Sequence, residues 1–157
     1  MTNTSKISIG CFLLVSQLLS AGTCRAVELP LRERAAQSQV IARVLILETP
    51  ATDPPGYFRH TARAKVILPI KGVVQDQIIT LDFDTGLKCP NIIYSKGEDC
   101  LVFLTRQRNG RLITLNDYYG KNMVDGNTVR GWSVQRDSHR DVPLPLAMQM
   151  IRKLLAH

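Results

Sequence analysis

Two cysteines, Cys89 and Cys100, are the residues of this chain whose spacing most clearly suggests a chemistry. In an oxidising compartment an even pair forms a disulfide, and here the pair closes a loop of 11 positions. Pro90 and Gly97 within the loop favour a tight reversal, and the chain-entropy model assigns such a bridge about 2 to 3 kcal/mol. A zinc ligand pair or a thiol nucleophile would need partners, but no histidine stands at metal-ligand spacing from either cysteine. We therefore predict a structural disulfide and no metal site.

Asp82 and Asp84 are two positions apart, so in a strand their carboxylates share one face. Together with a histidine, such a pair could perform acid/base chemistry or hold a cation, which makes a small metal-dependent hydrolase one alternative. Two solvated carboxylates on the outer face of a strand are the interpretation that we favour. The sequence contains no Ser-His-Asp set, phosphate-binding loop or metal-binding motif. We accordingly predict no catalytic residues and no cofactor.

Arginine and aromatic side chains suggest a third chemistry, the recognition of a partner. Three arginines flank an Asn-Gly pair that is typical of a hairpin turn, and five aromatic residues lie in or near predicted loops. These candidates are Arg106, Arg108, Arg111, Tyr57, Phe58, Tyr118, Tyr119 and Trp132. Exposed aromatics beside a basic hairpin favour a protein or glycan partner. The alternative is a solvated hairpin end for the arginines and core packing for the rings.

The first 26 residues have the layout of a secretory signal peptide. Lys6 gives a positive start, residues 7–19 form a short apolar stretch, and small residues follow. The small-x-small rule places cleavage after Ala26, which we favour, or after Gly22. A minor alternative makes Cys24 the lipidated first residue of a lipoprotein. The apolar stretch is too short to remain as a membrane-spanning helix.

Export changes the balance of charges and cysteines. The chain has 157 residues, with 20 Lys and Arg against 13 Asp and Glu. Removing residues 1–26 takes away Lys6, Arg25 and two cysteines but no acidic residue, so 18 basic residues face 13 acidic ones and the net charge falls from +7 to +5. We predict a single domain over 27–157, periplasmic or secreted, with no transmembrane segment. Its expected partner is an envelope or extracellular protein or glycan, and not a nucleic acid.

Hydropathy patterns indicate a chain made mainly of antiparallel strands. An almost unbroken apolar run fits a buried first strand, and strict alternation in the next two predicts one buried face each. The Asn-Gly pair joins two further strands, and a second turn at 125–127 leads into the last. The predicted strands are 40–47, 57–70, 77–83, 100–105, 111–116 and 128–134.

The last element is an amphipathic helix over 145–156. Pro143 and Pro145 bound its entry, and apolar residues then recur at helical spacing. These residues are Leu146, Met150, Ile151, Leu154 and Leu155. Such a stripe predicts packing on the core, the alternative being a groove on a partner protein. The sequence thus predicts a mainly β protein of five or six antiparallel strands with a C-terminal helix.

The order of these motifs carries a family resemblance. A second strand ending in Leu-Pro-Ile-Lys-Gly at 68–72 precedes Cys89, the stretch Gly-Glu-Asp-Cys-Leu-Val-Phe-Leu at 97–104 and the Asn-Gly hairpin. Over about residues 36–156 the chain resembles bacterial exported domains that are similar to tissue inhibitors of metalloproteinases and netrin modules. The resemblance implies an OB-like barrel, a five-stranded Greek key.

The sequence departs from this family at the inhibitory residue. The animal inhibitors act through a cysteine at the start of the mature chain, whose free amine and carbonyl chelate the zinc of the target. Only Cys24 could take that part, but Thr23 and Ala21 are poor recognition residues for cleavage just before it, and lipidation would acylate its amine. We therefore predict an exported, non-catalytic binding module, and keep the hydrolase and the protease-inhibitor-like module as alternatives.

Overall fold

The computed structural model describes residues 27–49, 59–84, 92–108 and 110–156. The predicted signal peptide, and Cys24 with it, lies outside these described residues, as do Tyr57, Phe58 and Cys89. The expectations that concern them therefore stay predictions. No helix within the described ranges is long and apolar enough to cross a membrane.

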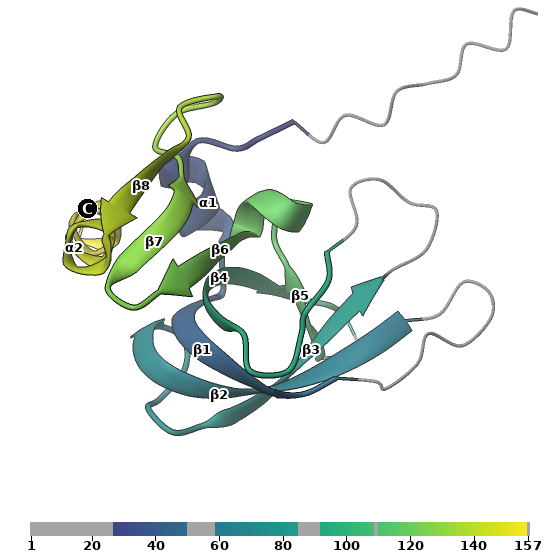
Figure 1. Ribbon diagram of the computed structural model, residues 1–157. Coiled ribbons are helices and arrows are strands. Elements are labelled where there is room, and N and C mark those ends of the chain that lie inside the picture. Colours follow the sequence, from purple (N-terminus) through teal and green to yellow (C-terminus); the bar gives the residue numbers. More distant parts are fainter. Residues whose placement is uncertain (1–26, 50–58, 85–91, 109, 157) are drawn as a thin grey trace, which may run out of the picture.

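Five strands close into a barrel (Figure 1). They are β1 (Val40–Glu48), β2 (Arg59–Lys71), β3 (Ile78–Asp84), β4 (Asp99–Arg106) and β5 (Leu112–Thr114). Hydrogen-bonded neighbours follow the order β1-β2-β3-β5-β4, and β4 pairs with β1 to complete the ring. The predicted mainly β, five-stranded barrel is confirmed.

The direction of one strand pair corrects the prediction of an all-antiparallel sheet. The short strand β5 runs parallel to β3, with Leu81 opposite Leu112 and Asp82 opposite Ile113. An odd number of strands cannot alternate in direction around a closed ring, so a five-stranded barrel must contain one parallel pair. The other barrel pairs are antiparallel.

Alternating side chains fill the barrel as the sequence predicted. Ala62, Ala64 and Val66 of β2 and the apolar residues of β3 point inward, where they form one cluster with Cys100 of β4. The strands β1 and β4 are buried on both faces because a second layer covers their outer side. This double burial explains why their sequences are nearly continuous apolar runs.

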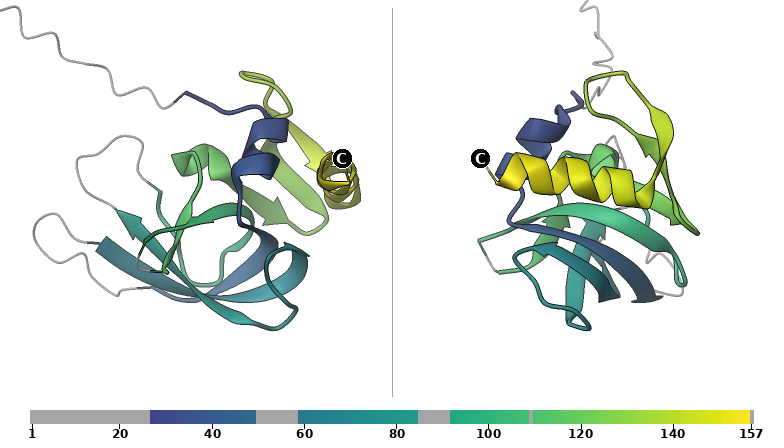
Figure 2. Two further views of the ribbon diagram at one scale, coloured as in Figure 1. Left: turned by 180° about the vertical axis from the view of Figure 1, so that it is seen from behind. Right: turned by 90° about the vertical axis from the view of Figure 1, so that its left-hand side faces the viewer.

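The second layer consists of three strands and two helices on one side of the barrel (Figures 1 and 2). Its elements are β6 (Lys121–Asp125), β7 (Thr128–Trp132), β8 (Arg140–Pro143), α1 (Leu31–Gln37) and α2 (Leu144–Leu155). The strand β6 pairs with both β4 and β7, which continues the barrel sheet into this layer. The total of eight strands exceeds the five or six predicted.

The predicted C-terminal helix is confirmed to within one residue at each end. It begins after Pro143 and carries Pro145 in its first turn, a position that proline tolerates because the amide there has no partner inside the helix. Its buried side chains include Met148 and Ile151, which join the second core. Of the predicted apolar stripe, Ile151 is fully buried, Met150, Leu154 and Leu155 pack partly buried against the core, and Leu146 stays exposed.

Cys100 is fully buried and forms no disulfide with any other residue that the structure describes. Burial raises the pKa of its thiol to about 12, and the nearby Lys121 opposes this shift. A thiol in this environment is protonated at neutral pH and makes a poor nucleophile. Because Cys89 lies outside the described residues, the Cys89–Cys100 disulfide remains a prediction.

Candidate functional site

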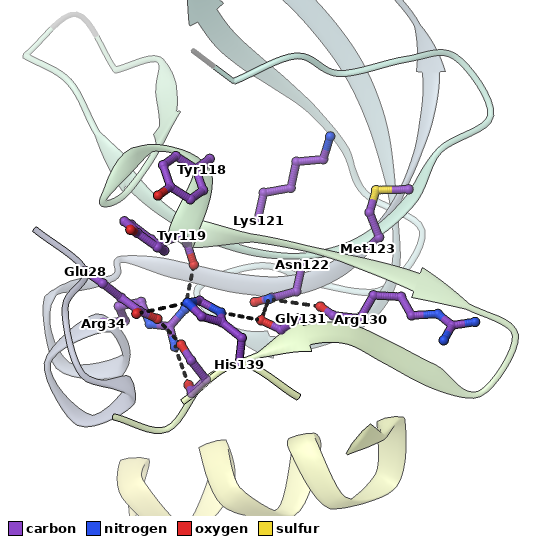
Figure 3. Close-up of a pocket in the computed structure, with 11 residues that line it drawn as sticks. Glu28, Arg34, Tyr118, Tyr119, Lys121, Asn122, Met123, Arg130, Gly131 and His139 are labelled. Atoms are coloured by element: carbon purple, nitrogen blue, oxygen red, sulfur yellow. Dashed lines mark hydrogen bonds and ion pairs between the residues drawn. The ribbon is translucent and has the colours of Figure 1, made fainter. Parts of the chain in front are cut away.

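A pocket of about 290 Å³ opens where β6 and β7 meet the 3-10 helix η1 (Asp117–Gly120) and the segment that contains Glu28 and Arg34 (Figure 3). Eleven residues line it: Glu28, Arg34, Tyr118, Tyr119, Lys121, Asn122, Met123, Arg130, Gly131, Ser133 and His139. Its volume lies near the lower end of the range of small-molecule sites, which suits a small ligand or one unit of a longer one.

Two of the predicted recognition residues, Tyr118 and Tyr119, stand at this pocket. Both belong to η1, whose tight turn follows Asn116 in the left-handed conformation. Gly120 ends the turn so close to the backbone that a side-chain Cβ there would lie 1.9 Å from the Leu115 carbonyl oxygen. The two rings lie with centroids 3.9 Å apart, and Tyr118 is 46% exposed. The prediction of exposed aromatics is therefore confirmed for Tyr118.

A buried pair of opposite charges forms the floor of the pocket. Arg34 of α1 is 1% exposed and Glu28 is 2% exposed. The Arg34 guanidinium donates to the Tyr119 carbonyl oxygen at 2.5 Å and to the carbonyl and hydroxyl oxygens of Ser133 at 2.5 and 3.0 Å. The Glu28 carboxylate accepts hydrogen bonds from the Ser133 hydroxyl and, at 2.9 Å, from the Asp137 amide. Ser133 thus links the two charged groups.

Aromatic rings complete the surroundings of Arg34. Its guanidinium carbon lies 5.4 Å from the ring centroid of Phe103 and 6.0 Å from that of Trp132. Such cation–π contacts strengthen when water is excluded. Burial lowers the pKa of Arg34, and the charge of Glu28 opposes that shift.

His139 forms one wall of the pocket and stacks on Tyr119, with the ring planes 19° apart. Its Nε2 lies 3.3 Å from a Glu28 carboxylate oxygen, and its Nδ1 lies 3.2 Å from the Gly131 carbonyl oxygen. Both neighbours are hydrogen-bond acceptors, so only the imidazolium can donate to both at once. His139 lies in an exposed loop, and these contacts attach that loop to the wall of the pocket.

Asn122 of β6 presents an unused acceptor at the pocket. Its amide nitrogen donates to the carbonyl oxygens of Arg130 and Gly131 at 3.3 and 3.2 Å, which fixes the orientation of the amide. The side chain is 7% exposed, and its oxygen has no hydrogen-bond partner among the described residues. Figure 3 shows this amide beside the Gly131 backbone, below Tyr119 and Lys121. A buried, unpaired amide oxygen is costly unless a ligand or water donates to it.

The remaining charged residues of the pocket are paired with groups outside it. Lys121 lies 2.7 Å from the carboxylate of Glu98. Arg130 lies 2.6 Å from both Asp125 and Asp141, and these contacts raise its pKa. Neither cation is therefore a strong attractor for an anionic ligand.

Among the described residues, Asp82 and His60, two candidates for the alternative hydrolase site, do not come together. Asp82 is 3% exposed and lies 3.5 Å from Arg111, so the predicted solvated carboxylate is in fact buried. His60 is paired across the strands with Phe83, next to Asp82 in sequence, so the alternation of β3 places His60 and Asp82 on opposite faces. The side chain of Asp84 lies outside the described part. No cluster of three or more metal-ligating side chains occurs among the residues that the structure describes.

The other recognition candidates that the structure describes lie apart from the pocket. Arg106 and Arg111 flank the turn between β4 and β5, where Arg106 donates to the Gly110 carbonyl oxygen at 2.7 Å, and Arg108 is exposed on the same turn. Trp132 is fully buried in the second core, 6.2 Å from Phe103, so the core-packing interpretation holds for this ring and it is not part of a recognition surface.

Sequence reasoning missed four residues that shape the pocket. These are Glu28, Arg34, Asn122 and His139. One signal was available for Arg34. Leu31 lies three positions before Arg34 and four before Ala35, so these three residues belong to the buried face of the helix. An arginine on an apolar helix face indicates a buried partner.

The Glu28 carboxylate predicts an acid-sensitive stability. Burial tends to raise its pKa, but hydrogen bonds from Ser133 and the Asp137 amide, with the charges of His139 and Arg34, bring it below 4.5, the ordinary value of a glutamate carboxyl. A carboxyl whose pKa is depressed in the folded state stabilises that state above the unfolded pKa, and this contribution is lost as the pH falls through the folded pKa. We expect the melting temperature of the wild type to fall as the pH drops below about 4.5.

A pair of glutamine variants isolates this contribution. Glu28→Gln should lower the free energy of unfolding at neutral pH by about 1.5 to 3 kcal/mol, because hydrogen bonds to a charged group are lost. It should also reduce the fall of the melting temperature at acid pH. Glu33→Gln, on the exposed side of α1, should leave both unchanged. Thermal unfolding is measured from neutral pH to pH 3. If the melting temperatures of both variants fell with pH as steeply as that of the wild type, Glu28 would not be the source of the acid sensitivity.

The comparisons with known proteins give no family for this chain. No protein-family model, curated protein or solved structure is significantly similar to it.

Proposed function

We propose that the protein is an exported, non-catalytic binding module whose ligand occupies the pocket between η1, β6 and β7. The observation that carries the proposal is the Asn122 oxygen, a buried acceptor with no partner among the described residues. It lies in the same pocket as Tyr118, a half-exposed aromatic ring. An apolar ring beside an unsatisfied polar atom is the combination on which ligand sites are built.

Binding fits the ionisable groups of this pocket better than catalysis does. A general acid or base needs a proton position that a substrate can reach. The Glu28 carboxylate lies between the Ser133 hydroxyl and the His139 ring, so it accepts from the group that a catalytic triad would use as nucleophile. The Ser133 hydroxyl donates to Glu28 and accepts from Arg34, so both its proton and its acceptor capacity are already used within the protein. These contacts support a rigid binding wall.

Export is the second part of the proposal, and the predicted signal peptide supports it. The residues directly after Ala26 belong to the folded domain. The Asn116 amide donates to the Val27 carbonyl oxygen at 2.8 Å, and its oxygen accepts from the Leu29 amide at 2.7 Å. Cleavage after Ala26 would thus leave Glu28 in place at the pocket.

A ligand-observed NMR screen of small neutral and charged fragments tests the proposal. We expect fragments that bind the wild-type protein to lose binding to Met123→Trp, because Met123 lines the pocket, is 40% exposed, and a larger ring there would fill the opening. Val74→Trp, which places the same ring at a position 67% exposed and outside the pocket lining, is the matched control.

Two outcomes would contradict the proposal. Equal binding of the fragments to Met123→Trp and wild type would place the ligand elsewhere. Conversion of a bound fragment into a product during a day of incubation would show a catalyst.

A further inference from the structure

Every lysine and arginine of the pocket lining already has a carboxylate near it, which favours a ligand without net charge. Among the described residues, Glu28 acts on Arg34, Glu98 pairs with Lys121, and Asp125 and Asp141 both pair with Arg130. An anionic ligand would have to displace one of these partners, and a cationic one would meet three positive charges. Desolvating a charge without a new partner is costly.

The hydrogen-bonding requirement of the pocket is specific. Asn122 offers an oxygen and no free N–H, since both N–H groups of its amide are directed at backbone carbonyls. A ligand must therefore bring an O–H or N–H donor to this point. The Asn122 oxygen shares the pocket with a row of three rings, Tyr118, Tyr119 and His139, of which Tyr118 is 46% exposed.

An extended peptide does not fit the site as an added strand. The strand β6, which carries Asn122, is already paired with β4 on one side and β7 on the other. Strand addition requires a free edge. The pocket lining also contains a single aliphatic side chain, Met123, so it offers little to an apolar peptide anchor.

Resting on the proposed function, and naming its ligand class, we propose that the pocket binds one unit of a neutral saccharide. A sugar ring brings several O–H donors, carries no charge, and presents a face of C–H groups that packs on an aromatic ring. The Tyr118 ring would hold that face, and a hydroxyl or acetamido N–H would donate to the Asn122 oxygen. The volume of about 290 Å³ admits a single ring with its substituents.

Titration by NMR and calorimetry with defined oligosaccharides tests this ligand class. The neutral probes are chitotriose, cellotriose and maltotriose, the anionic probe is trigalacturonate, and an end-blocked trialanine represents a neutral peptide. We expect at least one neutral sugar to bind with a Kd of about 1 mM or tighter, and the anionic sugar and the peptide to bind at least about tenfold more weakly.

Variants connect this binding to the pocket. Tyr118→Ala and Asn122→Ala should each weaken the neutral sugar by about tenfold or more, equivalent to about 1.4 kcal/mol. Asn127→Ala, an exposed asparagine of the β6–β7 turn, should stay within about twofold of the wild type. Tyr118→Ala alters an exposed side chain, so it remains informative if Asn122→Ala fails to fold.

Three outcomes would overturn the inference that the ligand is a neutral saccharide. Binding of trialanine or trigalacturonate in preference to all three neutral sugars would replace the ligand class while leaving the proposed function intact. Suppose that none of the three neutral sugars binds, while fragments bind the wild type and not Met123→Trp. This result would also reject the saccharide and leave the proposed function intact. Sugar binding unaffected by Tyr118→Ala would place the saccharide outside the pocket.

Discussion

Replacing Arg34 with methionine is expected to lower the free energy of unfolding by about 3 to 5 kcal/mol. Methionine keeps much of the side-chain length, so the loss comes from electrostatics more than from volume. The substitution removes one of the two positive groups that lower the pKa of the buried Glu28 carboxylate, and it takes the guanidinium donor away from the carbonyl oxygens of Tyr119 and Ser133. Uncompensated buried charges and acceptors are among the most costly defects in a protein.

Urea denaturation at neutral pH measures this loss, with Arg32→Met as the matched control. Arg32 is exposed on the same helix, so its variant should stay within about 0.5 kcal/mol of the wild type. Arg34→Lys should fall between the two, because lysine keeps the charge but cannot reach three acceptors with a planar fork. A loss below about 1 kcal/mol in Arg34→Met would show that the buried pair does not hold the floor of the pocket.

Trp132→Ala is expected to cost about 3 to 5 kcal/mol, the range for a large aromatic side chain deleted from a core. The indole is fully buried between the barrel and α2, where it contacts Phe103 and lies against the Arg34 guanidinium. If Trp132 lay on the surface, the other interpretation that the sequence left open, the same change would stay within about 0.5 kcal/mol.

The same urea experiment compares Trp132→Ala with Tyr118→Ala. Tyr118 is half exposed, and losing its contact with Tyr119 should cost about 0.5 to 1.5 kcal/mol. The sequence alone left open which of these rings packs in the core. We expect Trp132 to support the fold and Tyr118 to face the ligand. Equal losses in the two variants would contradict this division.

Local patterns in the sequence were sufficient to predict the barrel strands. Alternation at Ala62, Ala64 and Val66 identifies the inner face of β2 because the period of a strand is two. The C-terminal helix was predictable for a similar reason, since prolines mark its start and apolar residues repeat at its period. The parallel pair of β3 and β5 follows from closure of five strands, a property of the ring and not of either segment.

The pocket could be predicted only in part because its residues come from distant parts of the chain. Glu28 and Ser133 are 105 positions apart, and Arg34 and Tyr119 are 85 apart. Their contact depends on how the second layer folds over β4. Asp82 was misjudged for the same reason, because the residue beside it, Arg111, belongs to another strand hairpin. The resemblance to inhibitor and netrin modules remains a prediction, and it names no residue of this pocket.

Backbone-amide chemical-shift mapping tests the central claim, that this pocket is the ligand site, most directly. The isotope-labelled wild-type protein is titrated with the strongest fragment of the screen or the strongest neutral sugar. We expect the largest shifts at Tyr119, Asn122, Gly131 and His139, which line the pocket. Shifts concentrated instead at the arginines of the β4–β5 turn, with the pocket amides unmoved, would contradict the account.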